Sequence, residues 1–148
     1  MAKIRLTKEF KFEMAHALLG YEGPCKNIHG HSYYLYVTVI GDVTEEKNSS
    51  QTGMVMDFTD LKNIVNSEIT NRLDHALALN SDTPTEILDS LKSFDNLVLM
   101  PYQPTCENML IDFADRIQKK LPPHINLFCL KLCETVTSFA EWYAADNI

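Results

Sequence analysis

Two histidines separated by a single glycine, His29 and His31, follow closely after Cys25 and are the residues best suited to chemistry in this sequence. Side chains two positions apart project from the same face of an extended backbone. Residues 32–40, which come next, are rich in tyrosine and β-branched side chains, a composition typical of a strand. The pattern therefore predicts that both imidazoles point to one place.

A third histidine, His16, ends an alternating run in which Phe10, Phe12 and Met14 share its phase. Two neighbouring strands could then present three imidazoles to one point. Three neutral histidines with an open fourth position are typical of catalytic zinc, whereas structural zinc is normally closed by four protein ligands. An isolated His-x-His pair also occurs without metal, so the spacing alone leaves open a metal site and a purely structural role.

Cys25 would lie near the cation of such a site as a free thiol. A nearby cation lowers the pKa of a thiol and makes a thiolate base or nucleophile available at neutral pH. The other cysteines are Cys106, Cys129 and Cys133. We expect reduced thiols rather than a disulfide framework. Cys129 and Cys133 share one phase, which favours small apolar packing over a metal pair.

Length and composition limit the classes of protein to consider. A chain of 148 residues with 45% hydrophobic content predicts a single domain, residues 1–148, with its own core. A formal net charge of −7 argues against nucleic acid as a partner, because phosphate backbones are bound by basic patches. The sequence contains no apolar leader and no run of ~20 apolar residues. We therefore expect a cytoplasmic protein that does not enter a membrane.

Periodicity predicts the order of the secondary structure. Alternation predicts strands, and apolar residues at helical spacing predict helices that start at capping residues such as Thr105. The expected strands are 3–15, 31–42, 54–56, 97–100 and 126–134, and the expected helices are 59–72, a short one near 85–94, and one from 105 to the prolines at 122–123. This order favours an α+β domain with an antiparallel sheet and helices on one face.

Glu134 shares the phase of Phe128, Leu130 and Leu132 at the end of the last predicted strand. An unpaired buried charge is energetically expensive, so a carboxylate on a buried face needs a partner. A bound ligand could be that partner. A solvated position just beyond the strand end is the alternative, and the sequence leaves both open.

Eight short motifs, in order along nearly the whole chain, resemble the 6-pyruvoyl-tetrahydropterin synthase family, in particular its bacterial branch of 6-carboxy-tetrahydropterin synthases in queuosine biosynthesis. Each motif is weak alone, and their common order makes the resemblance specific. The motifs are 12–16 (FEMAH), 20–23 (GYEG), 25–31 (CKNIHGH), 53–58 (GMVMDF), 60–62 (DLK), 73–75 (LDH), 104–108 (PTCEN) and 134–135 (ET).

The resemblance implies a tunnelling fold, a four-stranded antiparallel sheet with two main helices on one face. In that family trimers close their sheets into a barrel and pair into hexamers, with active sites between subunits. The implied site residues are zinc ligands His16, His29 and His31; catalytic Cys25, Asp74 and His75; Glu134 as anchor of the pterin; and Thr105 and Glu107 near the pterin pocket.

The resemblance also implies a reaction. A zinc lyase would convert 7,8-dihydroneopterin triphosphate to 6-carboxy-tetrahydropterin, acetaldehyde and triphosphate, without nicotinamide or flavin. The Cys-x3-His-x-His spacing resembles the carboxy-forming branch, and Cys25 disfavours the branch in which glutamate replaces this cysteine. The alternatives are an enzyme that stops at 6-pyruvoyl-tetrahydropterin and a pterin-binding zinc module without turnover. Residues 80–103 are longer than in the shortest bacterial members, and the sequence assigns no residue to the triphosphate.

Overall fold

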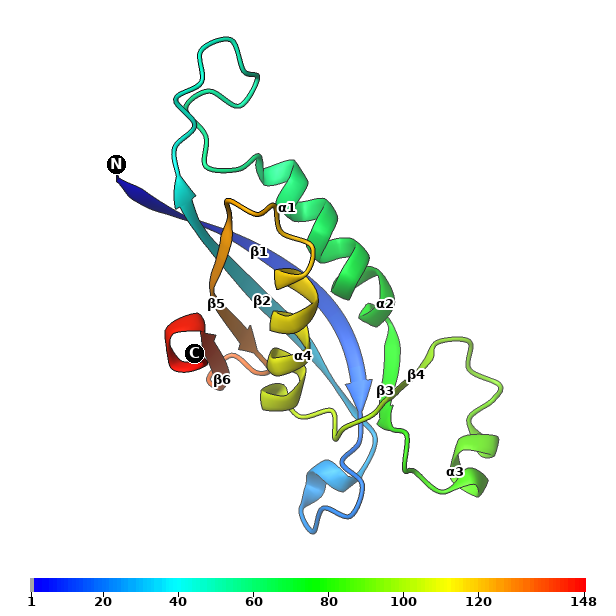
Figure 1. Cartoon of the computed structure of the whole chain (residues 1–148). Helices are drawn as coiled ribbons and strands as arrows, with labels where there is room; N and C mark the ends of the chain where they lie inside the picture. Colours follow the sequence, from blue (N-terminus) through cyan, green and yellow to red (C-terminus); the bar gives the residue numbers. More distant parts are fainter. Residues whose placement is uncertain (1) are drawn as a thin grey trace.

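Alternating apolar and polar residues build two long strands, β1 (Lys3–His16) and β2 (His29–Asp42), in the computed structural model (Figure 1). The structure describes residues 2–148. The two strands pair antiparallel along their whole length, from Lys3 opposite Asp42 to His16 opposite His29. The strands predicted at 3–15 and 31–42 are confirmed, and both extend far enough to include a histidine at the shared end.

Four more strands complete one mixed sheet. Strand β5 (Asn126–Cys133) pairs antiparallel with β2, and β6 (Phe139–Tyr143) pairs antiparallel with β5. At the other edge, β3 (Ala76–Asn80) runs parallel to β1, and β4 (Leu97–Met100) runs parallel to β3. The strand order is β4-β3-β1-β2-β5-β6.

The expected α+β class is confirmed, but a sheet of four strands is wrong for the whole chain. Strands β1, β2, β5 and β6 form the expected antiparallel set, and β3 and β4 add two short parallel strands. The strand predicted at 54–56 is absent from the structure, in which Val55 and Met56 are buried without strand pairing. Their apolar side chains meet the core from a turn, where Thr44 N donates to Met54 O at 2.8 Å.

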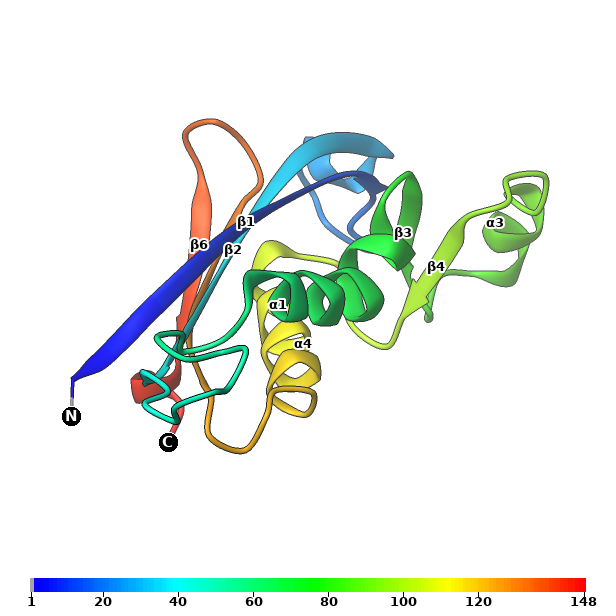
Figure 2. The ribbon, with the colours of Figure 1, turned by 90° about the horizontal axis from the view of Figure 1, so that it is seen from above.

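Two helical segments cover one face of the sheet, as Figure 2 shows. The first contains α1 (Phe58–Val65), a π-helical turn η2 (Asn66–Thr70) and α2 (Asn71–Leu73). It begins at Asp57, whose carboxylate accepts a hydrogen bond from Thr59 N at 2.7 Å. The predicted helix at 59–72 is confirmed in position, and its interior contains a π turn that the periodicity did not indicate.

The second segment is α4 (Cys106–Gln118), which starts at the predicted cap Thr105. The Thr105 hydroxyl accepts a hydrogen bond from Asn108 N at 3.2 Å, which satisfies one of the free amides of the first turn. Buried side chains of α4, among them Met109 and Phe113, pack on the sheet. No helix among residues 2–148 is both long enough and apolar enough to cross a membrane.

The remaining short helices lie in connections. Helix α3 (Thr85–Ser90) is part of the connection that joins β3 to β4 along the chain. It projects away from the two covering segments (Figure 2). The single turn η1 (Pro24–Lys26) lies in the connection from β1 to β2, and η3 (Ala144–Asp146) follows β6. The connection that holds η1 starts after His16 and ends before His29, so the fold places it beside both histidines.

Candidate active site

Strand pairing gathers three imidazoles at one end of the sheet. His16 and His29 are directly paired across β1 and β2, and His31 lies two residues further along β2. The ring centroids are 4.6 Å (His16–His29), 5.2 Å (His16–His31) and 5.0 Å (His29–His31) apart. Glu134, just after β5, joins them, and one ligand atom from each of the four residues lies within 4.8 Å of every other.

Backbone carbonyls fix the protonation of two of these rings. His16 Nδ1 lies 2.8 Å from Pro104 O, and His29 Nδ1 lies 2.7 Å from Asn27 O. A carbonyl oxygen can only accept, so each Nδ1 carries the hydrogen and each Nε2 has a free lone pair. The two Nε2 atoms are 3.1 Å apart, a distance at which two lone pairs repel unless a cation or a proton lies between them. Carbonyl-oriented imidazoles of this kind are typical of metal ligands.

His31 and Glu134 complete the cluster. The buried His31 Nε2 has no hydrogen-bond partner among the described residues, although Glu134 Oε1 lies 3.0 Å away, because the angles are unfavourable. Burial lowers the pKa of His31 from its ordinary 6.5, the neighbouring His16 and His29 lower it further, and Glu134 opposes them. The ring is therefore neutral at pH 7 and can act as a ligand. Three imidazole nitrogens and a carboxylate are a donor set that suits zinc.

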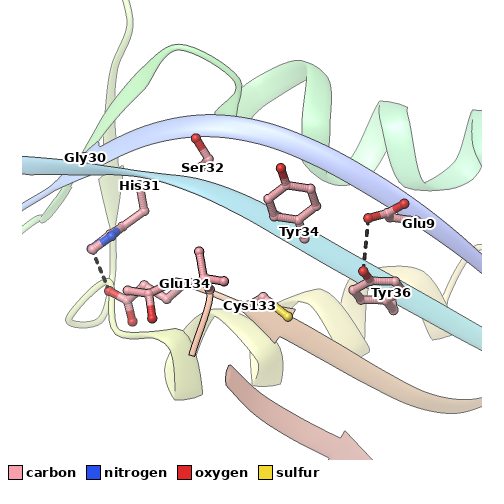
Figure 3. A pocket seen from close by; sticks show the side chains of 10 residues that line it. Glu9, Gly30, His31, Ser32, Tyr34, Tyr36, Cys133 and Glu134 are labelled. Atoms are coloured by element: carbon pink, nitrogen blue, oxygen red, sulfur yellow. Dashed lines mark hydrogen bonds and ion pairs between the residues drawn. The ribbon is translucent and has the colours of Figure 1, made fainter. Parts of the chain in front are cut away.

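The Glu134 carboxylate is half-buried and paired rather than solvated. Its Oε1 lies 3.3 Å from His16 Nε2, and its pKa is lowered chiefly by this contact with His16 and also by the nearby His31 and His29, against the effect of burial. Figure 3 shows the Glu134 side chain beside His31, and both residues line one pocket. The carboxylate can thus face either the imidazoles or a molecule in the pocket.

That pocket has a volume of about 660 Å³ and opens beside the cluster (Figure 3). This volume lies within the range of about 300–1,000 Å³ that is typical of pockets for small molecules. Tyr36 OH donates to Glu9 Oε1 at 3.0 Å on its far wall. The residues that line the pocket are Glu9, Gly30, His31, Ser32, Tyr34, Tyr36, Cys133, Glu134, Thr135 and Val136.

Cys25 lies in η1, within the connection between His16 and His29. Its side chain is half-buried, and its thiol makes no hydrogen bond to any of residues 2–148. Its carbonyl accepts a hydrogen bond from Leu18 N at 3.0 Å, which ties the two arms of the connection together. The structure therefore places the thiol on the segment that links two of the clustered imidazoles.

Asp74 and His75 form a separate, exposed pair after α2. His75 Nδ1 lies 3.1 Å from Asp74 Oδ2, and the two side chains are 80% and 46% exposed. Asp74 Oδ1 accepts from Glu13 N at 2.9 Å, and His75 N donates to Glu13 O at 2.6 Å. The Glu13 amide is the main cause that lowers the pKa of Asp74, and His75 adds to it. His75 has a φ of +61°, a strained conformation for a residue with a side chain.

The pair does not join the four-residue cluster. His75 and His31 instead line the same shallow depression of about 360 Å³, together with Glu13 and Ser32. Strain of this kind persists only where surrounding contacts impose it, and it is common at functional sites. Both hydrogen bonds to Glu13 hold the pair against β1.

Comparison with known proteins identifies the family. The family described as 6-pyruvoyl tetrahydropterin synthase matches residues 5–145 of this chain. The chain belongs to this family. The expected family is therefore confirmed, and with it the expectation of an enzyme.

Individual relatives cover almost the whole chain. A Haemophilus influenzae protein named 6-carboxy-5,6,7,8-tetrahydropterin synthase is 34% identical over 141 residues, which cover 93% of this chain and 97% of that protein. A Rickettsia typhi protein of the same name is 32% identical over 142 residues, with coverages of 93% and 99%. The structure of Caenorhabditis elegans 6-pyruvoyl tetrahydropterin synthase aligns with a TM-score of 0.68 over 97% of both chains, at 23% identity, and supports the fold alone.

The start of α4 contains Thr105 and Glu107, which were expected near the pterin pocket. Both residues lie outside the cluster formed by the three histidines and Glu134. Thr105 caps the helix and Glu107 is exposed in its first turn. Cys106 between them is buried, its thiol donates to Leu132 O at 3.2 Å, and burial is the main cause that raises its pKa to about 12.

Sequence reasoning missed the residues that orient the histidines and line the pocket. The carbonyls of Pro104 and Asn27 have no side-chain signature, so no pattern could reveal them. Tyr34 and Tyr36 did carry a signal, because they alternate with the buried Tyr33 and must face the open side of the sheet.

The lowered pKa of His31 predicts how acid affects the metal-free protein. As the pH falls below 6.5, the unfolded chain binds a proton at His31 before the folded protein does, so the free energy of unfolding should decrease until the pH reaches the lower folded pKa. Urea unfolding of metal-free protein at pH ~7.5 and ~5.5 tests this expectation. His31→Ala should show a smaller loss between the two pH values, and an equal loss would contradict the expectation.

Proposed function

We propose that this protein is a zinc-dependent lyase that converts 7,8-dihydroneopterin triphosphate and water into 6-carboxy-5,6,7,8-tetrahydropterin, acetaldehyde and triphosphate, for queuosine biosynthesis. The observation that carries the proposal is the convergence of three imidazole nitrogens, two with their tautomer fixed by carbonyls, beside a pocket of about 660 Å³. The similarity to proteins named 6-carboxy-5,6,7,8-tetrahydropterin synthase supports this product.

In this proposal His16, His29 and His31 hold the zinc through Nε2. Bound zinc would act as a Lewis acid that acidifies a coordinated substrate hydroxyl and the adjacent C–H bond. The Cys25 thiolate removes a proton from the substrate side chain, and the Asp74–His75 pair transfers a second proton, both as general acid–base groups. Glu134 binds the guanidine-like edge of the pterin through two charge-assisted hydrogen bonds.

We further propose a cytoplasmic homo-oligomer, a trimer or a dimer of trimers, with active sites between subunits. The exposed Asp74–His75 pair supports this arrangement. It is not part of the four-residue cluster, and its exposed side chains leave room for contact with another copy. Light scattering of the purified protein measures the assembly.

Product analysis tests the reaction. Purified, zinc-loaded protein is incubated with 7,8-dihydroneopterin triphosphate, and the products are identified by mass spectrometry. We expect 6-carboxy-tetrahydropterin and acetaldehyde. Accumulation of 6-pyruvoyl-tetrahydropterin would favour the synthase that stops earlier, and tight pterin binding without any product would favour a non-catalytic binding module.

Replacing Glu134 with glutamine tests the pterin anchor. The amide keeps the shape of the carboxylate but loses its charge and one acceptor, so pterin binding should weaken by roughly 1–3 kcal/mol. Titration calorimetry with a pterin analogue measures the dissociation constant. Zinc content should stay at the level of the unaltered protein, because the three histidines remain.

Glu134 Oε1 lies close to His31 and His16, so the zinc content of the same variant is a second informative measurement. If Glu134 were a fourth metal ligand, Glu134→Gln would lose zinc along with pterin affinity. Equal dissociation constants for the two proteins would refute the anchor role. Glu141→Gln, on β6, is a suitable control because Glu141 does not line the pocket.

A further inference from the structure

The side chain of Gln103 clamps the connection that contains Cys25. Leu19 N donates to Gln103 Oε1 at 3.0 Å, and Gln103 Nε2 donates to Leu19 O at 2.6 Å. The Gln103 side-chain amide thus binds both the backbone N–H and the backbone carbonyl of Leu19, which lies 84 positions away in the sequence. Apart from the strand ladders, these are the hydrogen bonds among residues 2–148 that join loop 17–28 to a segment distant in sequence.

A backbone hydrogen bond connects the clamped part of the loop directly to Cys25. Leu18 N donates to Cys25 O at 3.0 Å, so consecutive residues of the first arm bind Cys25 on one side and Gln103 on the other. Tyr21 N donates to Leu18 O at 3.3 Å and closes the turn between the arms. A shift of Leu19 would therefore carry the backbone of Cys25 with it.

Gln103 is itself held in the segment that orients a metal-ligand candidate. Its carbonyl accepts hydrogen bonds from Asn108 Nδ2 at 3.1 Å and from Thr105 N at 2.7 Å. The next residue, Pro104, uses its carbonyl to orient His16. Residues 103–105 thus position the loop, one imidazole and the start of α4 at the same time.

Packing alone supports this loop weakly. Tyr21 and Ile28 are about half exposed, at 50% and 54%. A cavity of about 400 Å³ lies between the loop and the β3–α3 region, where Leu79 and Ile87 line the opposite wall. Since the loop rests against a cavity rather than against a close-packed core, directed hydrogen bonds have the larger role in fixing its position.

We propose that Gln103 is a positioning residue that fixes Cys25 relative to the three histidines. This inference rests on the proposed function, in which the Cys25 thiolate must meet a substrate held at the histidine cluster. A small displacement of a reacting group far from any change in chemistry can lower turnover on the order of 100-fold. Gln103 touches neither the cluster nor the 660 Å³ pocket, so its contribution acts through the loop.

Gln103→Leu tests the clamp, because leucine has a similar size and neither polar group. We expect kcat to fall roughly 10- to 100-fold, with KM changed less than about twofold and full zinc content. Hydrogen exchange at the Leu18 and Leu19 amides should accelerate. Gln103→Glu keeps the acceptor for Leu19 N but turns an oxygen toward Leu19 O, so its kcat should lie between those of Gln103→Leu and the unaltered protein.

Gln118→Leu, an exposed glutamine at the end of α4, is the matched control and should change none of these readouts. Unchanged exchange of the Leu18 and Leu19 amides in Gln103→Leu would overturn the clamp, whatever the enzyme's reaction. Accelerated exchange without any loss of kcat would overturn the positioning role. If the unaltered protein made no product while exchange still accelerated, the proposed function would fail and the clamp would stand.

Discussion

Replacing His29 with alanine is expected to abolish stoichiometric zinc binding and turnover while the protein stays folded. The substitution removes one of three converging imidazoles, so only two of the three proposed zinc ligands, His16 and His31, remain. The fold should survive because His29 is only partly buried and lies at the strand end, away from the main core. An open catalytic site, unlike a small structural zinc domain, does not have to drive folding.

Elemental analysis of the purified variant measures zinc per chain, and circular dichroism confirms the fold. His124→Ala is the matched control, because His124 is exposed and lies outside the cluster. It should retain zinc and activity. Full zinc retention by His29→Ala would refute the assignment of the ligands.

Replacing Cys25 with alanine is expected to remove turnover but neither zinc nor substrate. Loss of a general base typically lowers the rate by roughly 10²–10⁴-fold, whereas ground-state binding persists when only transition-state chemistry is removed. Steady-state kinetics and calorimetry with the substrate separate the two effects. Turnover at the unaltered rate would move proton abstraction to His75.

The same thiol should be the most reactive of the four cysteines once zinc is bound. Cys106 is buried and has its pKa raised to about 12, so it should alkylate slowly. Mass mapping after brief exposure to iodoacetamide measures the order of modification. Cys129→Ala provides the control for kinetics, since Cys129 lies on β5 outside the cluster and the pocket.

The long strands and the gathering of the histidines were predictable from periodicity. Alternation over the 14 residues of β1 and of β2 favours one register, in which the buried apolar side chains, such as Phe12 and Tyr33, face the helices. That register places His16, His29 and His31 on the same side. Strand β4 was predicted at its observed position, 97–100, whereas the five-residue β3 was not, and the parallel pairing of both strands was not predictable because it depends on segments distant in sequence.

The environment of the site was less predictable than its side chains. Pro104 orients His16 across 88 positions of sequence through a backbone atom that every residue possesses. The strand predicted at 54–56 was wrong for a related reason. The apolar side chains of Val55 and Met56 indicate that these residues are buried, but they do not indicate whether the backbone pairs with another strand. For Glu134, in contrast, the strand phase predicted a partner for the carboxylate. In the structure His16 and His31 are the residues that pair with it.

The left-handed backbone of His75 has a consequence for protein engineering. Glycine adopts a positive φ freely, whereas a residue with a Cβ is less stable there by roughly 1–2 kcal/mol, so His75→Gly would relieve this conformational penalty while deleting the imidazole. A directed-evolution library sorted by melting temperature alone would therefore enrich chains that have lost this imidazole. Thermostable versions of the enzyme should be selected with a counter-screen for turnover, or with this codon held constant.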